Sequence, residues 1–192
     1  MKRIVNYTLL TAITFMALAQ EDYSSITNYP DKYTAGTITA RMLDGLGFRY
    51  YWATDSLRPG DLSFKPSDEA RTSEETLNHI LGLTQVILNA SLKKPHQPVS
   101  ADEMTFEEKR AMTLGNIRKA ADIFRAASDA EMKEFEMVFQ RQDGSVSYPL
   151  WNLINGPIAD ALWHVGQVVS FRRSSGNPFN SKVSVLNGSV RD

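Results

Sequence analysis

The segment between Trp151 and Phe171 carries the side chains best suited to bind a metal ion. It is mostly apolar, with no lysine or arginine and one carboxylate, Asp160. His164 follows Asp160 by four residues and Gln167 follows His164 by three, so a helix places all three on one stripe. A carboxylate buried among apolar side chains is costly unless it is paired or holds a metal. Because Asp160 and His164 are one turn apart, both can ligate a single cation.

A third ligand is expected from a different part of the chain. His79 is the only other histidine inside a predicted helix, and it lies in an apolar stripe that should face the core. Two histidines and one carboxylate leave open coordination positions, as a catalytic or substrate-binding metal centre requires. The predicted metal ligands are therefore His79, Asp160 and His164. The residues predicted to support the ligands or line a substrate pocket are Gln167, Trp163, Trp52 and Asn155.

The same residues also fit a purely structural role. Asp160 and His164 can form a hydrogen-bonded pair in the core without any metal. His96 stands in a loop with two prolines and two lysines, where a solvated side chain is expected rather than a ligand. The aromatic group Tyr50-Tyr51-Trp52 suits a hydrophobic core at least as well as a binding pocket.

Four predicted helices must position these side chains. Apolar spacing predicts them over residues 34–57, 72–92, 105–128 and 150–173. Thr72 with Glu75, and Thr105 with Glu108, form capping boxes that mark where the second and third helices begin. In the fourth helix the apolar residues occupy most of the circumference, which predicts a largely buried helix.

Helices joined by loops, with no alternating strands, predict an all-α four-helix bundle. A short hairpin is expected over residues 135–148, before the last helix, with Asp143-Gly144 as its two-residue turn. The second and fourth connections are long, which argues against a simple up-and-down topology.

The first residues have the features of a signal peptide. Lys2 and Arg3 precede an uncharged stretch over residues 7–19, which ends in the small-x-small pattern Ala17-Leu18-Ala19. We expect cleavage after Ala19 and export to the periplasm or medium, with residues 20–192 forming one domain. The stretch is too short to span a bilayer, so no stable membrane anchor is expected after cleavage. The alternatives are a membrane anchor or a buried first helix.

Composition limits the chemistry further. The chain contains no cysteine, which excludes disulfides, a thiol nucleophile and a Cys-x-x-Cys-His heme attachment motif. Its 21 basic and 22 acidic residues give a formal charge of −1, with no basic run or stripe. A nucleic-acid partner is therefore not expected.

Several segments of the chain resemble the DinB-like (DinB/YfiT) four-helix bundles. Residues 78–80 (NHI) resemble the first metal-histidine segment of that family, and residues 160–167 (DALWHVGQ) resemble the motif on its last helix. In that motif a histidine is followed four residues later by His-Arg-Gly-Gln. Residues 172–178 resemble the usual exit from that helix, and residues 49–57 the end of the first helix.

The resemblance implies two helix pairs with a long connection and a divalent metal, commonly nickel or zinc, on three side chains near one end. Iron and manganese are the alternatives. By position His79 matches the first histidine and His164 the last. Asp160 replaces the middle histidine and Val165 replaces the arginine. A carboxylate ligand lowers the net positive charge of the site and weakens its Lewis acidity compared with three neutral histidines.

Known activities in the family include thiol-cofactor S-transferases, a thiol-dependent isomerase and metal-dependent hydrolases. Low-molecular-weight thiols are mainly cytoplasmic, so an exported member fits a hydrolase of a small-molecule substrate better than a thiol transferase. The alternative is a non-catalytic binding or stress-associated bundle that has lost the metal chemistry. Homodimers are common among such bundles. The sequence identifies neither a substrate nor a general base.

Overall fold

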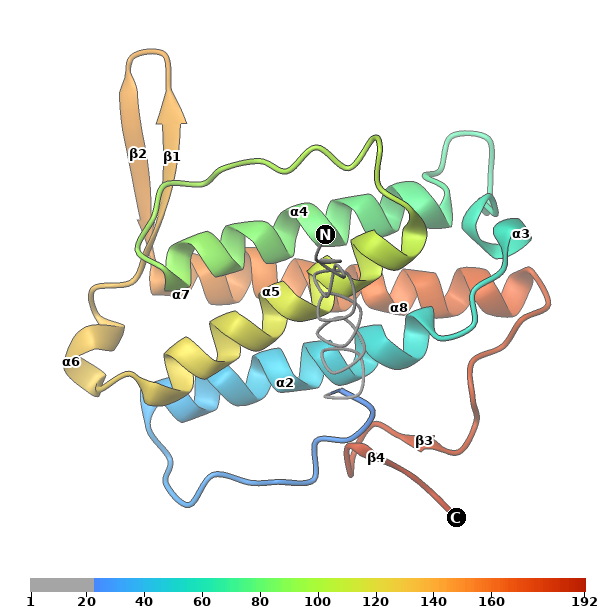
Figure 1. The fold of residues 1–192 in the computed structure, drawn as a ribbon, viewed down its shortest axis with the longest axis horizontal. Coiled ribbons are helices and arrows are strands. Elements are labelled where there is room, and N and C mark those ends of the chain that lie inside the picture. Colours follow the sequence, from blue (N-terminus) through green and yellow to red (C-terminus); the bar gives the residue numbers. More distant parts are fainter. Residues whose placement is uncertain (1–22) are drawn as a thin grey trace, which may run out of the picture.

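The computed structural model describes residues 23–192 and is mainly helical. Its long helices are α2 (Ala35–Thr54), α4 (Ser73–Ser91), α5 (Phe106–Ala126) and α8 (Ala159–Ser174). Helices α2 and α8 run in one direction, and α4 and α5 run in the other (Figure 1). The prediction of a mainly helical domain with a hairpin before the last long helix is confirmed. The predicted signal peptide, residues 1–19, lies outside the described residues.

Each long helix packs mainly against two others. Helix α2 contacts α5 and α8, and α4 contacts the same two helices from the opposite side. Because α4 and α5 run in the same direction, the chain between them must cross back along the molecule, as Figure 1 shows. The side chains between the helices form one core, which includes Leu43, Leu46, Ile80, Leu114, Ile117, Phe124 and Val165.

Local hydrogen bonds begin the helices where the sequence predicts. Thr72 accepts a hydrogen bond from the Glu75 amide while the Glu75 carboxylate accepts one from the Thr72 amide, at 3.1 and 2.7 Å. Thr105 and Glu108 repeat this reciprocal pair at the start of α5. Each box satisfies amides that have no partner within the helix, so a short local motif is enough to define the boundary.

The predicted last helix is interrupted near its start. It comprises α7 (Leu150–Leu153), a π-helical turn η1 (Ile154–Ile158) and then α8. Pro157 lies in the π-helical turn and has no amide hydrogen to donate to the helical ladder. The wider turn accommodates this proline without ending the helix.

The expectation that this last helix is largely buried is wrong. Only Ala161, Val165, Val168 and Arg172 of α8 are buried. Trp151 and Trp163 are 78% and 72% exposed. The helix lies at the edge of the domain, where α2 and α4 cover only part of its circumference. Apolar residues are common on protein surfaces, so apolar composition alone does not measure burial.

A short helix α6 (Asp129–Met132) leads into the hairpin formed by β1 (Glu136–Arg141) and β2 (Gly144–Pro149). Arg141 pairs with Gly144, so the two turn residues are Gln142 and Asp143 rather than Asp143 and Gly144. Gly144 has a φ of 137° and begins the second strand. Glycine adopts a positive φ more easily than other residues. This conformation is needed at the first residue of β2, one position after the turn, rather than within the turn as predicted.

His96 is also placed differently from the expectation. Its backbone amide donates to the carbonyl of Val138 at 2.7 Å, and its ring lies 5.5 Å from the ring of Phe139. The side chain is half-buried under the hairpin rather than fully solvated, and burial lowers the pKa of His96. It is distant in the fold from the predicted metal ligands, since it follows the end of α4.

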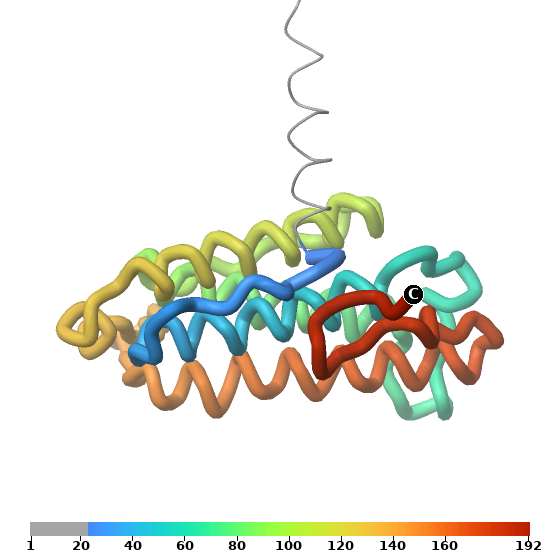
Figure 2. The backbone as a smooth tube through the Cα atoms, turned by 90° about the horizontal axis from the view of Figure 1, so that it is seen from below, coloured from blue at the N-terminus to red at the C-terminus, as the bar shows by residue number. Residues whose placement is uncertain are grey.

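The ends of the described chain lie side by side along the bundle. The C-terminal tail contains β3 (Val183–Ser184) and β4 (Ser189–Val190), and it turns back along α2 and α8 (Figure 2). The amide of Ile26 donates to the carbonyl of Gly188 at 2.8 Å, which joins the tail to the extended lead-in.

The helix α3 (Pro59–Leu62) connects α2 to the loop before α4. None of the described helices is long and apolar enough to cross a bilayer.

Candidate metal centre

Two neighbouring helices bring the three predicted ligands together. His79 lies in the second turn of α4, and Asp160 and His164 lie in the first two turns of α8. Helices α4 and α8 pack against each other and run in opposite directions (Figure 1). One donor atom from each of the three residues lies within 4.8 Å of the other two. Among residues 23–192, no other group of three such side chains is this close.

The carboxylate of Asp160 faces both imidazole rings. Its Oδ2 atom is 3.3 Å from Nε2 of His79, and its Oδ1 atom is 3.3 Å from Nε2 of His164. The two rings are 4.6 Å apart between centroids and nearly perpendicular. Ligands about 2.0–2.2 Å from a zinc ion at tetrahedral angles are separated by roughly 3.4 Å. The two contacts between Asp160 and the histidines therefore match the spacing of ligands around one ion, and the three donors together lie within 4.8 Å.

Gln167 contacts the other side of the His164 ring. Its carbonyl oxygen Oε1 lies 2.7 Å from Nδ1 of His164. An amide oxygen only accepts hydrogen bonds, so Nδ1 carries the proton and the neutral ring has its lone pair on Nε2. That lone pair faces the Asp160 oxygen, and two acceptors at 3.3 Å repel each other. A cation between them, either a proton on Nε2 or a metal ion, removes the repulsion.

The three ligands are partly exposed at the surface rather than buried in the core. The exposed fractions of the side chains are 35% for His79, 41% for Asp160 and 15% for His164. The expected cost of burying a lone carboxylate therefore does not apply to Asp160, and the case for a metal rests on geometry. Partial exposure leaves room for water or another ligand on the solvent side, as open coordination requires.

The structure places the other predicted site residues in different surroundings. Trp163 precedes His164 and points to solvent, and Asn155 is exposed within η1. Trp52 lies on α2 and lines a pocket with Leu162 and Val165. At 100° per residue those two α8 positions lie on a different face from Asp160. Trp52 is therefore not brought to the three ligands, whereas Gln167 is.

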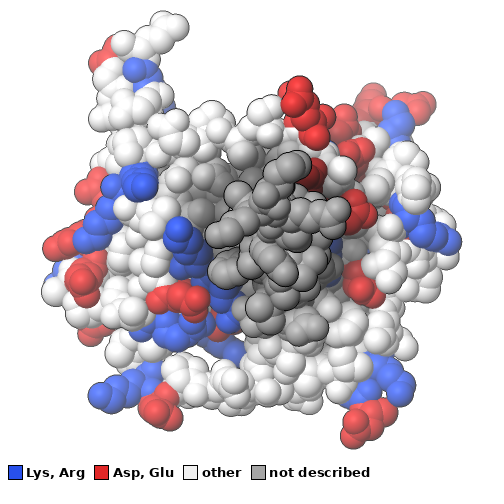
Figure 3. Space-filling view, viewed as in Figure 1, with Lys and Arg blue, Asp and Glu red and all other residues white. Residues whose placement is uncertain are grey.

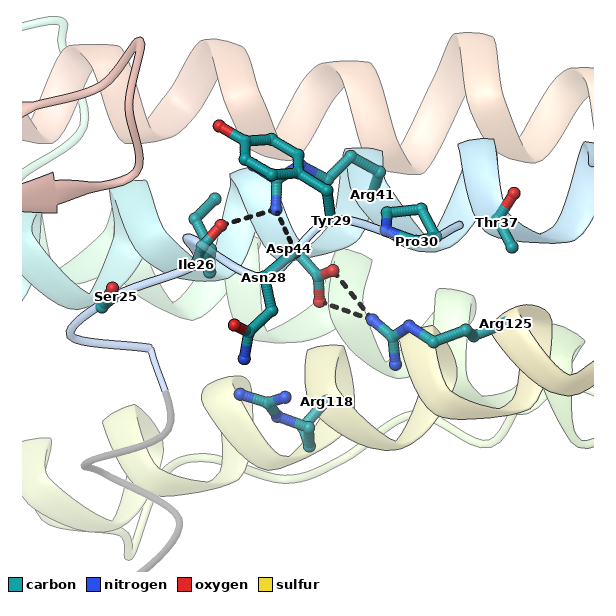
Figure 4. Close-up of a pocket in the computed structure, with 10 residues that line it drawn as sticks. All are labelled: Ser25, Ile26, Asn28, Tyr29, Pro30, Thr37, Arg41, Asp44, Arg118 and Arg125. Carbon is teal, nitrogen blue, oxygen red and sulfur yellow. Dashed lines mark hydrogen bonds and ion pairs between the residues drawn. The ribbon is translucent and has the colours of Figure 1, made fainter. Parts of the chain in front are cut away.

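A further pocket, which the sequence does not predict, is built around three arginines and one aspartate (Figure 4). Asp44 on α2 accepts from Nη2 of Arg125 on α5 with both oxygens, at 2.8 and 3.0 Å. Arg41 donates to the carbonyl of Ile26 at 2.7 Å, and its guanidinium stacks on Tyr29. These contacts fasten the lead-in and α5 to α2. We assign this pocket a structural role.

The described residues on the face drawn in Figure 3 form no large patch of one charge that would indicate a different binding site. This face carries acidic and basic side chains interspersed, with acidic ones gathered toward the end of the molecule where α3 lies.

Comparison of the chain with protein-family models, with curated proteins and with solved structures finds no match.

Proposed function

We propose that the protein is a DinB-like four-helix bundle in which His79, Asp160 and His164 hold one divalent metal ion, and that it acts as a metal-dependent hydrolase. The observation that supports this most is the contact between His164 Nε2 and Asp160 Oδ1. Gln167 directs the lone pair of His164 toward a carboxylate oxygen at 3.3 Å, and a metal ion between them would be bound by both atoms.

A divalent ion supplies Lewis acidity at such a site and lowers the pKa of water that it binds. The protein supplies the geometry. His79 and Asp160 contribute one donor from each of two helices, so the rigid packing of α4 on α8 fixes their separation. Gln167 keeps the His164 ring in the tautomer and orientation that ligation needs. A small-molecule substrate would approach from the exposed side of the three ligands.

The donor set favours particular ions. Imidazole nitrogen suits zinc, nickel and iron, and the carboxylate adds manganese to the candidates. Two histidines and one carboxylate with open positions are typical of both catalytic zinc sites and non-heme iron sites. We propose nickel or zinc first, as the resemblance implies.

Elemental analysis of protein purified without a tag or chelator tests the site. About one ion per chain is expected in the wild-type protein, and none in His79→Ala or His164→Ala. The matched control is His96→Ala, which removes the remaining histidine without removing a proposed ligand and should keep the ion. Equal metal content in all three variants would overturn the proposed site.

Hydrolysis is tested separately, once the bound ion is known. A panel of activated carboxylic and phosphate esters is incubated with the metal-loaded protein, with the metal-free protein and with loaded His96→Ala. Turnover should require the ion and persist in the control. Stoichiometric metal with no turnover of any ester would retain the metal site and reject this reaction class.

One observation favours a second candidate, a non-catalytic bundle. Both Asp160 oxygens already face an imidazole nitrogen, so the cluster can be satisfied as a hydrogen-bonded trio. In that case replacing Asp160 and His164 together by leucine should leave the protein as stable as before or more stable. A large drop in melting temperature for the double variant would count against this candidate.

We also propose that the chain is exported after cleavage behind Ala19. The basic start, the uncharged stretch and the small-x-small end support this. Cell fractionation and N-terminal sequencing of the exported form should give a protein that begins at Gln20. Recovery of the full-length chain only in the cytoplasm would reject export.

A further inference from the structure

A second pocket lies between α2, α8 and the C-terminal tail, which we call the α2–α8 pocket. It encloses about 360 Å³. Arg49 and Trp52 line it from α2, Val165 and Gly166 from α8, and Phe179 from the tail. The tail runs along this side of the bundle in Figure 2. Pockets of roughly 300–1,000 Å³ with mostly apolar walls are typical small-molecule sites.

Two arginines contribute positive charge to this apolar pocket. Arg49 and Arg173 both line it, and no aspartate or glutamate does. Among the described residues, neither guanidinium forms an ion pair with a carboxylate. Arg49 is half-buried and donates to the carbonyl of Gly45 at 2.9 Å, and burial lowers its pKa. Arg173 is exposed and lies over the ring of Phe179.

A half-buried guanidinium loses hydration, and the single carbonyl that Arg49 contacts replaces only part of it, with no carboxylate in the described pocket to balance the charge. Most of the other lining side chains are aliphatic or aromatic, and they include Phe48, Leu162, Val169 and Val183. A ligand that complements both features has an apolar body and one negative head group. Guanidinium groups bind carboxylates through paired hydrogen bonds, and the apolar walls would cover the body of such a ligand.

We propose that the α2–α8 pocket binds a small amphiphilic carboxylate, with its head group at Arg49 and Arg173 and its apolar part against Trp52 and the α8 side chains. This site is distinct from the proposed metal centre. Val165 and Val169 lie on a face of α8 well away from the stripe of Asp160 and His164. Binding therefore requires no metal, and metal-free protein is suitable for the test.

The probe is decanoate, read out by fluorescence of Trp52. Trp151 and Trp163 are replaced by phenylalanine to remove their signal, and both are highly exposed, so the double variant should fold normally. Decanoate should change the Trp52 emission with saturation. Decanol, which has the same chain without the charge, should bind at least tenfold more weakly. Decyl phosphate distinguishes the head groups, and binding tenfold tighter than decanoate would overturn the carboxylate assignment.

Two variants locate the ligand in the pocket. A Cβ atom at Gly166 would meet no heavy atom within 4 Å, so Gly166→Leu has open space there and should fill part of the pocket. Gly115→Leu on α5 is the matched control, because its Cβ also meets nothing and it does not line the pocket. Decanoate affinity should fall at least tenfold in Gly166→Leu and stay unchanged in the control.

Arg49→Met keeps a long side chain but removes the charge, and it should weaken decanoate binding at least tenfold while leaving decanol binding unchanged. Arg141→Met, at an exposed arginine on the hairpin, is its control. Equal affinity for decanoate and decanol in the wild-type protein would overturn the proposal, as would undiminished decanoate binding by folded Gly166→Leu. Either result leaves the metal centre untouched, because its test is elemental content.

Discussion

The Nδ1 atom of His164 lies 2.7 Å from the Oε1 atom of Gln167, three residues later on the same helix. This contact determines which ring nitrogen carries the proton, because an amide oxygen cannot donate. It therefore leaves the lone pair of the neutral His164 ring on Nε2, which lies 3.3 Å from Asp160. The proposed metal site therefore depends on Gln167, although Gln167 is not itself a proposed ligand.

Replacing Gln167 by methionine should weaken metal binding without abolishing it. The variant keeps the length of the side chain but removes the accepting oxygen, so His164 can rotate or change tautomer. Loss of such a supporting contact typically lowers metal affinity about 10–100-fold. Competition with a chromophoric chelator measures the affinity. Gln142→Met, at an exposed glutamine in the hairpin turn, is the control, and equal affinities in the two variants would contradict the assigned role.

The carboxylate of Asp160 can be tested by restoring the histidine that the resemblance implies. Asp160→His should still bind a divalent ion through three imidazoles. Asp160→Ala should lose more than about 100-fold in metal affinity, because losing a ligand costs more affinity than losing a residue that only orients a ligand. Asp143→Ala, at an exposed aspartate in the hairpin turn, should behave like the wild-type protein. Wild-type affinity in Asp160→Ala would show that Asp160 does not touch the ion.

Asp61 should make stability depend on pH in acid. This buried carboxylate accepts hydrogen bonds from Arg58, Ser175 and Asn177, which join α3 to the end of α8. The side-chain hydrogen bonds from Arg58 lower the pKa of Asp61 most, to well below its usual range, and those from Ser175 and Asn177 lower it further. A depressed folded-state pKa means that the stabilisation is present above the unfolded pKa, about 4, and is lost as pH falls toward the folded value.

The variant Asp61→Asn keeps the shape and cannot titrate. At neutral pH it should be less stable than the wild-type protein by about 1.5–3 kcal/mol, as expected for hydrogen bonds to a charged group. Urea unfolding at a series of pH values should show this difference shrinking between about pH 4 and pH 2. A difference that stays constant with pH would mean that the charge of Asp61 contributes nothing.

Gly36 should tolerate no side chain. It begins the contact of α2 with the end of α5, and a Cβ atom there would lie 2.2 Å from the carbonyl oxygen of Phe124. Gly36→Ala must push the helices apart and should destabilise the protein by about 1–3 kcal/mol. In contrast, Gly115→Ala meets no atom within 4 Å and should stabilise α5 by roughly 0.5–1 kcal/mol. Urea denaturation of both variants measures the change in free energy of unfolding. A less stable Gly115→Ala protein would contradict the conclusion that the Gly115 position has room for a methyl group.

The features that the sequence predicts best depend on neighbours along the chain. The capping boxes at Thr72 and Thr105 begin helices because both partners of each hydrogen bond lie within four residues. The stripe of Asp160, His164 and Gln167 follows from the period of one helix in the same way. The hairpin turn was displaced by one residue because Asp143 and Gly144 suit either register, and strand pairing chose between them.

The burial of side chains and the contacts between residues distant in the sequence could be seen only in the tertiary structure. The sequence predicts a largely buried last helix with Trp163 at the candidate site, yet the packing of α8 at the edge of the domain leaves Trp151 and Trp163 exposed. His96 reads as a solvated loop residue, yet the hairpin covers it. Arg49 and Arg173 are 124 positions apart in the chain. They line one pocket only because α2 packs against α8 and the C-terminal tail runs back along both helices. No pattern among neighbouring residues of the sequence predicts such long-range contacts.

The sequence by itself determined the four long helices, the capped starts of α4 and α5 and the set of side chains that could ligate a metal. These follow from hydrogen bonds and periodicity within a few residues. Only the tertiary structure decided that His79 meets Asp160 across 81 positions of the chain, with 3.3 Å between their nearest atoms. That distance depends on how α4 and α8 pack, which is set by the shape of many side chains in the common core rather than by the three ligands themselves.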